Sequence, residues 1–464
     1  MIRNSLLLPI LFFTIFSGTF AQEELLSKDE AVKLALENNF GIRVARNQVE
    51  IADNNQSVLN SGFLPTLTGN AGANYQRDDS TFEFPGQFLQ DENGDLLIDP
   101  DSGDPVARPK TDLYKAEAQR YNASLTANYV LFDGLGRFYN YKRLREQYQL
   151  SELQARETIE NTMLQLFSVY FEVARLSENE NVLSQALEIS TQRIKRAEYA
   201  FEYGQNTKLD ILNAQVDVTN DSINLLNTRQ QLANTKRDLN VILNQNLNEI
   251  FMVDTLVSFI PKLQLEEYIS QADLNNVALL QTERNLNINT YDIKVEKSGY
   301  LPTVGLNGTY GWNLNQNAPG AFFPGVNVNN TRNFGLGASL TWNLFDGGGT
   351  TVRVKNSKIA YENQELLQEQ VELEVARDIQ NALAIFENRL NIYKIQEQNV
   401  ITNQNNFERS KEQFQLGRIT SIEFRQAQIN LLNAQTNKNL AKYDAKLSEL
   451  QLLQLTGQLL NVEL

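Results

Sequence analysis

Apolar and polar residues alternate along four segments of the chain. Every second residue is apolar and most residues between are Asn, Thr or Ser in residues 64–75, 121–132, 301–312 and 334–345. A period of two predicts β-strands with one apolar and one polar face. Such alternation is also typical of half-buried strands in a soluble sandwich. Strands about ten residues long with aromatic residues near their ends favour transmembrane strands.

Two other stretches have a helical period. Residues 138–203 and 351–416 contain no internal Pro or Gly, and their apolar residues recur at spacings of four and three. Each would form a packed helix about 100 Å long, at about 1.5 Å per residue. Shorter helices are expected to return along them, over residues 27–60, 208–245, 264–297 and 421–458. Ser27 and Glu30 predict a capping box for the earliest of these.

These elements occur twice. YGQNTKLDILNAQ at residues 203–215 matches LGRITSIEFRQAQ 213 positions later, and SGFLPTL at residues 61–67 matches SGYLPTV at 298–304. The second pair is 237 positions apart, 24 more than the first pair. The first repeat must therefore contain 24 extra residues, which we place in a polar surface loop between about Arg77 and Arg120. We therefore predict a first repeat over residues 22–246, an equatorial linker over 247–263 with a strand-like stretch, and a second repeat over 264–464.

Four strands per chain cannot close a barrel, whose smallest common form has about eight strands. Open strand edges in lipid leave backbone groups unpaired, at several kcal/mol each. The chain is therefore predicted to oligomerise, and the strand count alone allows a dimer or a trimer.

The N-terminus predicts export. Arg3, an apolar run over residues 6–16 and Thr19-Phe20-Ala21 form a signal peptide over residues 1–21. No later stretch is apolar enough for a transmembrane helix.

Composition excludes several functions. The chain has no Cys and no His, which removes thiolate nucleophiles, Ser-His-Asp triads, zinc sites built on these residues, disulfides and an N-terminal lipid anchor. The formal net charge of −15 argues against nucleic acid as a partner. We expect no enzyme activity, no cofactor and no metal centre. Residues 91–104 are acidic at calcium-like spacing, but they lack the ordered positions of an EF-hand, so an acidic loop with an Asn-Gly turn is the alternative to a calcium site.

The strings SGFLPT, LFDG and YGQNTKLDILNAQ, with their second copies, resemble the TolC-type outer-membrane efflux duct family, in its non-lipidated branch. The resemblance covers nearly all of the chain after the signal peptide. It implies an α+β membrane protein that forms a homotrimer, with a twelve-stranded β-barrel in outer-membrane lipid and a twelve-helix α-barrel in the periplasm. It also implies a periplasmic adaptor protein and an inner-membrane pump of the RND or ABC type as partners.

The resemblance implies a passive export duct of a tripartite efflux system. A duct for type I protein secretion has the same fold and is the first alternative. A periplasmic coiled-coil scaffold is an alternative from another class, which would explain the helices but not the four amphipathic strands.

The candidate site lies at the two hairpin tips. Gly204 and Gly417 each end a long helix, and each is followed by a T-x-x-[DE] capping box. Capping alone could explain the carboxylates. The resemblance implies a periplasmic entrance formed by Tyr203, Asp210, Arg418 and Glu423. It implies adaptor docking on Gly204, Gln205, Asn206 and Thr207 and on Gly417, Arg418, Ile419 and Thr420.

Two positions depart from the family pattern. Members like TolC carry an arginine two residues after the second tip glycine and a further aspartate one turn beyond the first acidic position, where this chain has Ile419 and Gln426. Because Arg418 is displaced by one position, the closed entrance is expected to be held differently here.

Overall fold

The computed structural model describes residues 24–317 and 328–462. The predicted signal peptide lies outside the described residues. The chain divides into a helical unit, built from residues 1–50, 150–283 and 366–464, and a sheet unit, built from residues 51–149 and 284–365. Each unit thus takes segments from both sequence repeats.

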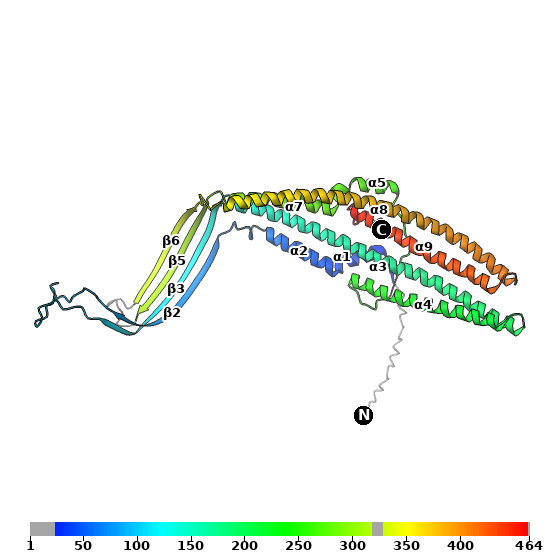
Figure 1. Cartoon of the computed structure of the whole chain (residues 1–464), viewed down its shortest axis with the longest axis horizontal. Helices are drawn as coiled ribbons and strands as arrows, with labels where there is room; N and C mark the ends of the chain where they lie inside the picture. The colour runs from blue at the N-terminus through cyan, green and yellow to red at the C-terminus, as the bar shows by residue number, and fades with distance from the viewer. Residues whose placement is uncertain (1–23, 318–327, 463–464) are drawn as a thin grey trace, which may run out of the picture. The chain divides into compact units, whose positions relative to one another are not determined.

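The sheet unit holds four antiparallel strands in the order β2-β3-β5-β6 (Figure 1). The strands are β2 Thr66–Phe82, β3 Thr111–Asp133, β5 Thr303–Asn317 and β6 Val328–Thr341. Their register puts like residues in rows across the sheet. One row is Gly69, Leu125, Tyr310 and Phe334; the next residue along gives Thr68, Thr126, Thr309 and Gly335. The sheet therefore has one apolar and one polar face, as the alternation predicted.

The strand ends differ from the expected ones. β2 and β3 continue to pair through part of the predicted loop, so the loop shortens to residues 83–110. Within it the Asp91 carboxylate accepts backbone N–H bonds from Asn93 and Asp95, which forms the turn. β6 ends at Thr341 rather than at residue 345 because the chain already turns toward the next helix. There the Asp346 carboxylate accepts from the backbone N–H of Thr350 at 2.7 Å, and Trp342 Nε1 donates to the carbonyl of Tyr300.

The helical unit is dominated by two hairpins. Helix α3 Gly136–Glu202 is followed by α4 Lys208–Leu243, and α8 Gly349–Gln415 by α9 Ser421–Leu455. The first turns of α3 and α8 belong to the sheet unit. Phe167, Tyr170 and Phe171 of α3 are almost fully buried and pack with Tyr443 and Leu450 of α9 in the main core. Among the described residues, no helix is both long and apolar enough to span a membrane.

Two predicted helices are interrupted. The segment expected over residues 27–60 forms α1 Lys28–Asn38 and α2 Phe40–Gln56, and the one expected over 264–297 forms α5 Lys262–Ser270, α6 Ala272–Asn275 and α7 Val277–Ser298. Asn side chains cap the new helices at two of the three breaks, while the break between α5 and α6 lies at Gln271, which makes no side-chain cap bond. Asn39 Oδ1 accepts from the N–H groups of Gly41 and Ile42, and Asn276 Oδ1 accepts from Leu279, so each Asn starts a new helix. Ser27 caps α1 by accepting from the Glu30 N–H, which is the serine half of the predicted box.

The equatorial segment is tied to the helices by polar side chains. β1 Glu24–Leu26 pairs in parallel with β4 Phe251–Val253. Tyr170 joins the two strands, since its hydroxyl donates to the carbonyl of Leu26 and accepts from the N–H of Asp254. Further along, Lys446 donates to the carbonyl of Ser258 and Glu449 accepts from the N–H of Ile260 at 2.6 Å. Side chains of α3 and α9 thus provide hydrogen-bond partners for backbone N–H and carbonyl groups of this segment, which β1 and β4 alone do not pair.

Candidate functional site: the hairpin tips

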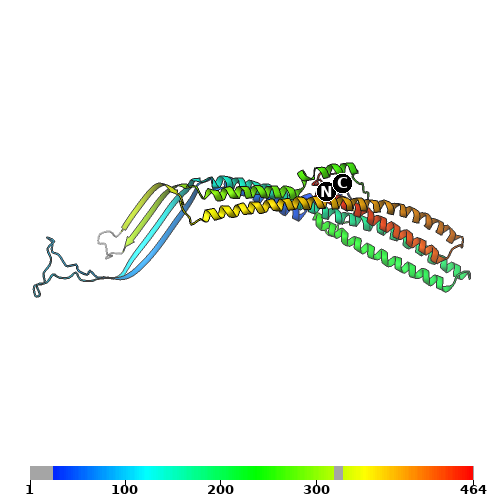
Figure 2. The same ribbon diagram turned by 45° about the horizontal axis from the view of Figure 1, so that its top comes forward.

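The two tips have the same backbone turn. Gly204 and Gly417 have φ of 71° and 72°, in the left-handed region that favours glycine. In each tip the residue after the glycine donates its N–H back across the last helical turn, Gln205 to Ala200 at 2.8 Å and Arg418 to Gln413 at 2.9 Å. Both hairpins turn at the same end of the helical unit (Figure 2).

Each return helix begins with a carboxylate cap. Asp210 accepts from the backbone N–H of Thr207 at 2.9 Å and from its hydroxyl at 2.8 Å. Glu423 accepts the same pair of bonds from Thr420 at 2.7 and 2.8 Å. These bonds, the backbone one first, lower the pKa of both carboxyl groups from their ordinary values. Both residues are therefore anionic at neutral pH.

The other predicted residues differ in exposure. Tyr203 is 80% exposed, and Gln205, Asn206 and Arg418 are also exposed. Arg418 forms no ion pair within the described part of the chain. Ile419 is half-buried and packs against the aromatic cluster of Phe407, Phe414 and Phe424.

A buried ionic network below the tips was missed by the sequence analysis. Arg425 of α9 makes two 2.7 Å hydrogen bonds to Asp221 of α4, and Asp221 also accepts from Ser190 of α3. Arg193 of α3 donates to Asp217 of α4 at 3.0 Å. The network therefore joins both hairpins of the helical unit, through charges that are largely removed from water.

The two arginines respond differently to this burial. Burial is the largest influence on Arg193 and lowers its pKa from the ordinary value, against the opposing charge of Asp217. Burial also acts to lower the pKa of Arg425, but its bonds to Asp221 and the charge of Asp217 outweigh it and leave that pKa raised. Guanidinium groups keep their charge at any physiological pH, so the network is permanently ionic.

The same residues line a cavity of about 300 Å³ beside the first turns of α4 and α9. Its lining includes Arg193, Asp210, Asp217, Ser421 and Arg425. Of the four predicted entrance residues, Asp210 lines the same cavity as the ionic network. Arg193 also donates to the hydroxyl of Ser421 at 3.0 Å, which fixes the start of α9 against α3.

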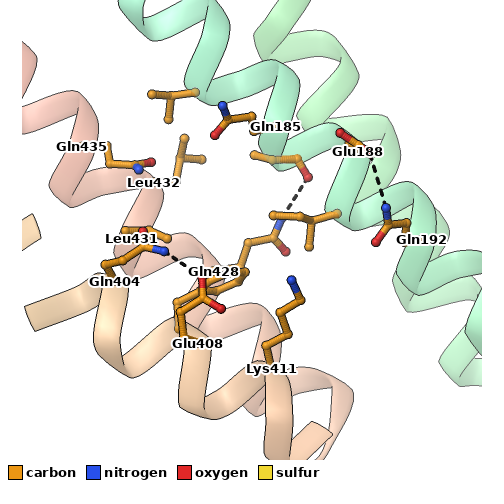
Figure 3. A pocket seen from close by; sticks show the side chains of 14 residues that line it. Gln185, Glu188, Gln192, Gln404, Glu408, Lys411, Gln428, Leu431, Leu432 and Gln435 are labelled. Carbon is orange, nitrogen blue, oxygen red and sulfur yellow. Dashed lines mark hydrogen bonds between the residues drawn. The ribbon is translucent and has the colours of Figure 1, made fainter. Parts of the chain in front are cut away.

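A second cavity, of about 320 Å³, separates α3 from α8 and α9 (Figure 3). Its rim carries Gln185, Glu188, Gln404 and Lys411, and Gln428 reaches into it. Gln428 Nε2 donates to the Ala186 carbonyl at 2.8 Å, while its buried Oε1 has no partner among the described residues. The bond of Gln428 therefore adds a polar contact between the hairpins, beside the apolar packing of Ile189 of α3 against Phe407, Phe424 and Leu431.

Comparisons with known proteins agree with this architecture. A family model described as outer membrane efflux protein matches residues 31–245 and 268–458. The chain is 25% identical over 316 residues to outer membrane protein TolC of Vibrio cholerae, covering 67% of this chain and 70% of that one. It is 22% identical over 454 residues to outer membrane efflux protein BepC of Brucella suis, covering 96% and 88%.

Solved structures share the fold at low identity. The CmeC outer membrane channel of Campylobacter jejuni matches with a TM-score of 0.69 and 18% identity, over 93% of this chain and 85% of that one. The MtrE outer membrane channel of Neisseria gonorrhoeae in its open state matches with a TM-score of 0.65 and 16% identity, over 93% and 89%. With the family model matched along both repeats, this chain belongs to the outer membrane efflux protein family, whose members are outer-membrane channels.

Proposed function

We propose that this chain is the outer-membrane duct of a tripartite efflux system, in which three copies form a twelve-stranded barrel continued by a helical tunnel. The observation that carries this proposal is the open sheet. No described strand pairs with the outer edge of β2 or of β6, and one face of the sheet is apolar. Unpaired edges in lipid cost several kcal/mol per group, so further copies must pair with them.

A second surface supports oligomerisation. On α4 the side chains of Leu209, Leu212, Val216, Ile223 and Leu226 are 48–63% exposed. Their spacings of three, four, seven and three are those of a coiled-coil seam. A helix of a neighbouring copy would cover this seam, and the two repeats would then line one tunnel.

The strand faces provide the direct test. Leu340 pairs with Val304 on the apolar face, and Thr341 at the end of β6 lies on the polar one. Leu340→Arg should impair assembly because it places a charge on the lipid-facing side, whereas Thr341→Arg should be milder. The cost should be below the about 2–4 kcal/mol expected at the bilayer midplane, because Leu340 lies near one end of the apolar band. Heat-modifiable migration of the oligomer in outer-membrane fractions measures this. Equal behaviour of the two variants would contradict the assignment of faces.

The tips would dock the helical hairpins of a periplasmic adaptor. A Cβ added at Gly204 or Gly417 meets no atom within 4 Å, so a side chain there extends into open space. Gly204→Glu and Gly417→Glu should abolish export while the oligomer still inserts. Gly204→Ala and Gly417→Ala introduce the same backbone strain without the bulk, and should keep most export. Export lost equally in the alanine variants would show that these glycines serve the turn alone.

The entrance would favour cations. Asp210 and Glu423 would each be repeated by the symmetry of the oligomer, and rings of carboxylates select cations. Asp210→Asn combined with Glu423→Gln should reduce cation selectivity, measured as the reversal potential across a salt gradient in planar bilayers. An unchanged reversal potential would leave capping as the role of both carboxylates.

A duct for type I protein secretion has the same fold and is the alternative to an efflux duct. Deletion of the gene separates the two uses: an efflux duct leaves cells sensitive to small toxic molecules, whereas a secretion duct leaves a secreted protein inside the cell. The pump would be of the RND type in the first case and of the ABC type in the second.

A further inference from the structure

A hollow of about 530 Å³ lies in the apolar face of the sheet. It spans β3, β5 and β6 and reaches Pro65 just before β2, and its lining includes Ala127, Tyr129, Leu306, Leu336 and Ala338. It lies entirely within the sheet unit. The described side chains leave it unfilled.

Small residues create the hollow. Gly308 pairs with Ala127 on one side and with Leu336 on the other, so its row carries a gap where larger side chains would meet. A Cβ on Gly308 would come within 3.2 Å of a Leu336 methyl group, so Leu336 leans over the gap. The next row on the same face carries Leu125 and Tyr310, which are 51% and 52% exposed and stand above the floor.

The hollow lies at a defined level of the apolar band. Trp342 and Tyr300 mark one end of the band, where the indole N–H bonds to the Tyr300 carbonyl, and Trp312 lies toward the other end. From Val304 to Trp312 the strand rises about 26 Å at about 3.3 Å per residue. At the tilt of about 35–45° typical of barrel strands this covers about 19–22 Å of height, which fits within a lipid-facing band of about 25 Å. Aromatic residues at both ends are typical of the membrane interfaces. The hollow is therefore continuous with the surface that faces hydrocarbon.

We propose that this hollow is a binding site for one acyl chain of an outer-membrane phospholipid, which it retains longer than the surrounding lipid. The proposal rests on the proposed function, because it requires the apolar face to contact the bilayer. Inside a bilayer, contact is driven by van der Waals packing, since the lipid tails are as apolar as the protein. A void beside Gly308 would lose those contacts outright, and water is not stable in a hollow with so few polar partners.

The recognition is by shape. A flat apolar strand surface offers a chain contact on one side only, whereas this hollow offers a floor at Gly308 and walls at Tyr129, Leu306 and Leu336. A chain in the hollow therefore meets more protein atoms than a chain elsewhere on the face. The expected consequence is a slow-exchanging lipid at this position.

Ala338→Phe fills the hollow from β6, and Ala127→Leu fills it independently from β3. Ala71→Phe is the matched control, because Ala71 pairs with Ala123 on the same face but lies outside the hollow. The intact oligomer is purified in detergent and washed, and the phospholipid that it retains is counted by phosphorus assay. Both filling variants should reduce retained phospholipid at least about threefold, because the added side chain replaces the contacts of the acyl chain. The control should match the wild type.

Retention that is equal in the wild type and both filling variants would overturn the proposal. An equal loss in Ala71→Phe would also overturn it, because the lipid would then be general annular lipid. Heat-modifiable migration is recorded on the same samples: a wild type that forms no oligomer contradicts the proposed function, whereas an oligomer without retained lipid contradicts only the binding site.

Discussion

The turns at Gly204 and Gly417 have the same backbone geometry but different packing beneath them. Under Gly204 the buried side chains are small or aliphatic, chiefly Ala197, Ile211 and Ala214. Under Gly417, Phe424 stacks on Phe414 and on Phe407 with ring centroids 4.9 and 5.5 Å apart. The cap sequence therefore sets the conformation of a tip, and the packing beneath it sets how much free energy is needed to open it.

The second tip also receives support from the first hairpin. Arg196 of α3 donates to the carbonyls of Phe414 and Gln415, the last residues of α8, and its guanidinium lies 4.8 Å from the centre of the Phe414 ring. Few buried apolar contacts and exposed backbone bonds are typical of regions that open at low cost. We therefore expect the tip at Gly204 to open more readily than the tip at Gly417.

The largest effect is expected from the ionic network that joins the hairpins. Asp221→Ala leaves the buried guanidinium of Arg425 without its main partner, which typically costs about 3–5 kcal/mol. Amide hydrogen exchange in the first turns of α9 measures the loss. Asp221→Leu combined with Arg425→Met removes both charges and should stay close to the wild type. If the double variant were as unstable as Asp221→Ala, the attraction between the two charges would itself stabilise the helical unit. The cost of the single variant would then not come only from leaving the charge of Arg425 unpaired.

The aromatic cluster should account for most of the remaining difference between the tips. Phe424→Ala is expected to lower the free energy of opening at Gly417 by about 3 kcal/mol, at the low end for a buried Phe because the site is near the end of a hairpin. Hydrogen exchange at the two tips should then become similar. Ile211→Ala is the matching truncation beneath Gly204. If the Gly417 tip of Phe424→Ala still exchanged more slowly than the Gly204 tip, the contacts of Arg196 would support this tip more than the aromatic cluster does.

Alanine at either glycine should have equal effects. Both positions have the same φ and open space around the added Cβ, so the cost is backbone strain alone, about 1–2 kcal/mol. Hydrogen exchange of the tip amides in Gly204→Ala and Gly417→Ala measures it. A clearly larger loss at one tip would show that the packing beneath is coupled to the turn.

Acid should weaken both caps alike. Because folding lowers the pKa of Asp210 and Glu423, their contribution is present above the ordinary carboxyl pKa of about 4 and is lost as pH falls through the lowered values. Carboxyl carbon NMR shifts should titrate below the ordinary values at both residues. Thr207→Val and Thr420→Val remove the hydroxyl bond and should bring each pKa back toward its ordinary value. Titration at ordinary values in the unmodified chain would contradict the caps.

The repeated pattern of the sequence predicted the four strands, the two hairpins and the tip turns, because each depends on local periodicity and on a glycine at a left-handed position. The breaks at Asn39 and Asn276 were missed because no Gly or Pro lies near Asn276, and Gly41 after Asn39 stands inside the new helix. Each Asn is nevertheless a good N-cap, and this signal was present. The last strand was predicted to end at residue 345 but ends at Thr341. The alternation continues in the sequence through residues where the backbone already turns toward the helix that Asp346 caps.

The ionic network could not be derived from periodicity, since its charged residues lie at positions that a helical pattern assigns to packing. A signal lay in the disagreement between the repeats. At the 213-residue offset Arg425 corresponds to Leu212, and Asp221 corresponds to Ala434. Ala434 is buried, so the charge of Asp221 stands where the other repeat has a core residue, which indicates a partner nearby. Which residues partner each other depends on how the two hairpins pack, and no spacing within one helix contains that information.

The parallel pairing of β1 with β4 has a consequence for how the chain matures. Glu24 pairs with Phe251, so the earliest described residues bond to a segment that lies between the two repeats. A chain that crosses a membrane from its N-terminus must therefore keep this strand unpaired until the whole first hairpin has followed. Contacts so distant in sequence form slowly, and an unpaired edge is open to proteases and to association with other chains during the wait. Biogenesis of the protein should depend on periplasmic chaperones more strongly than its final stability suggests.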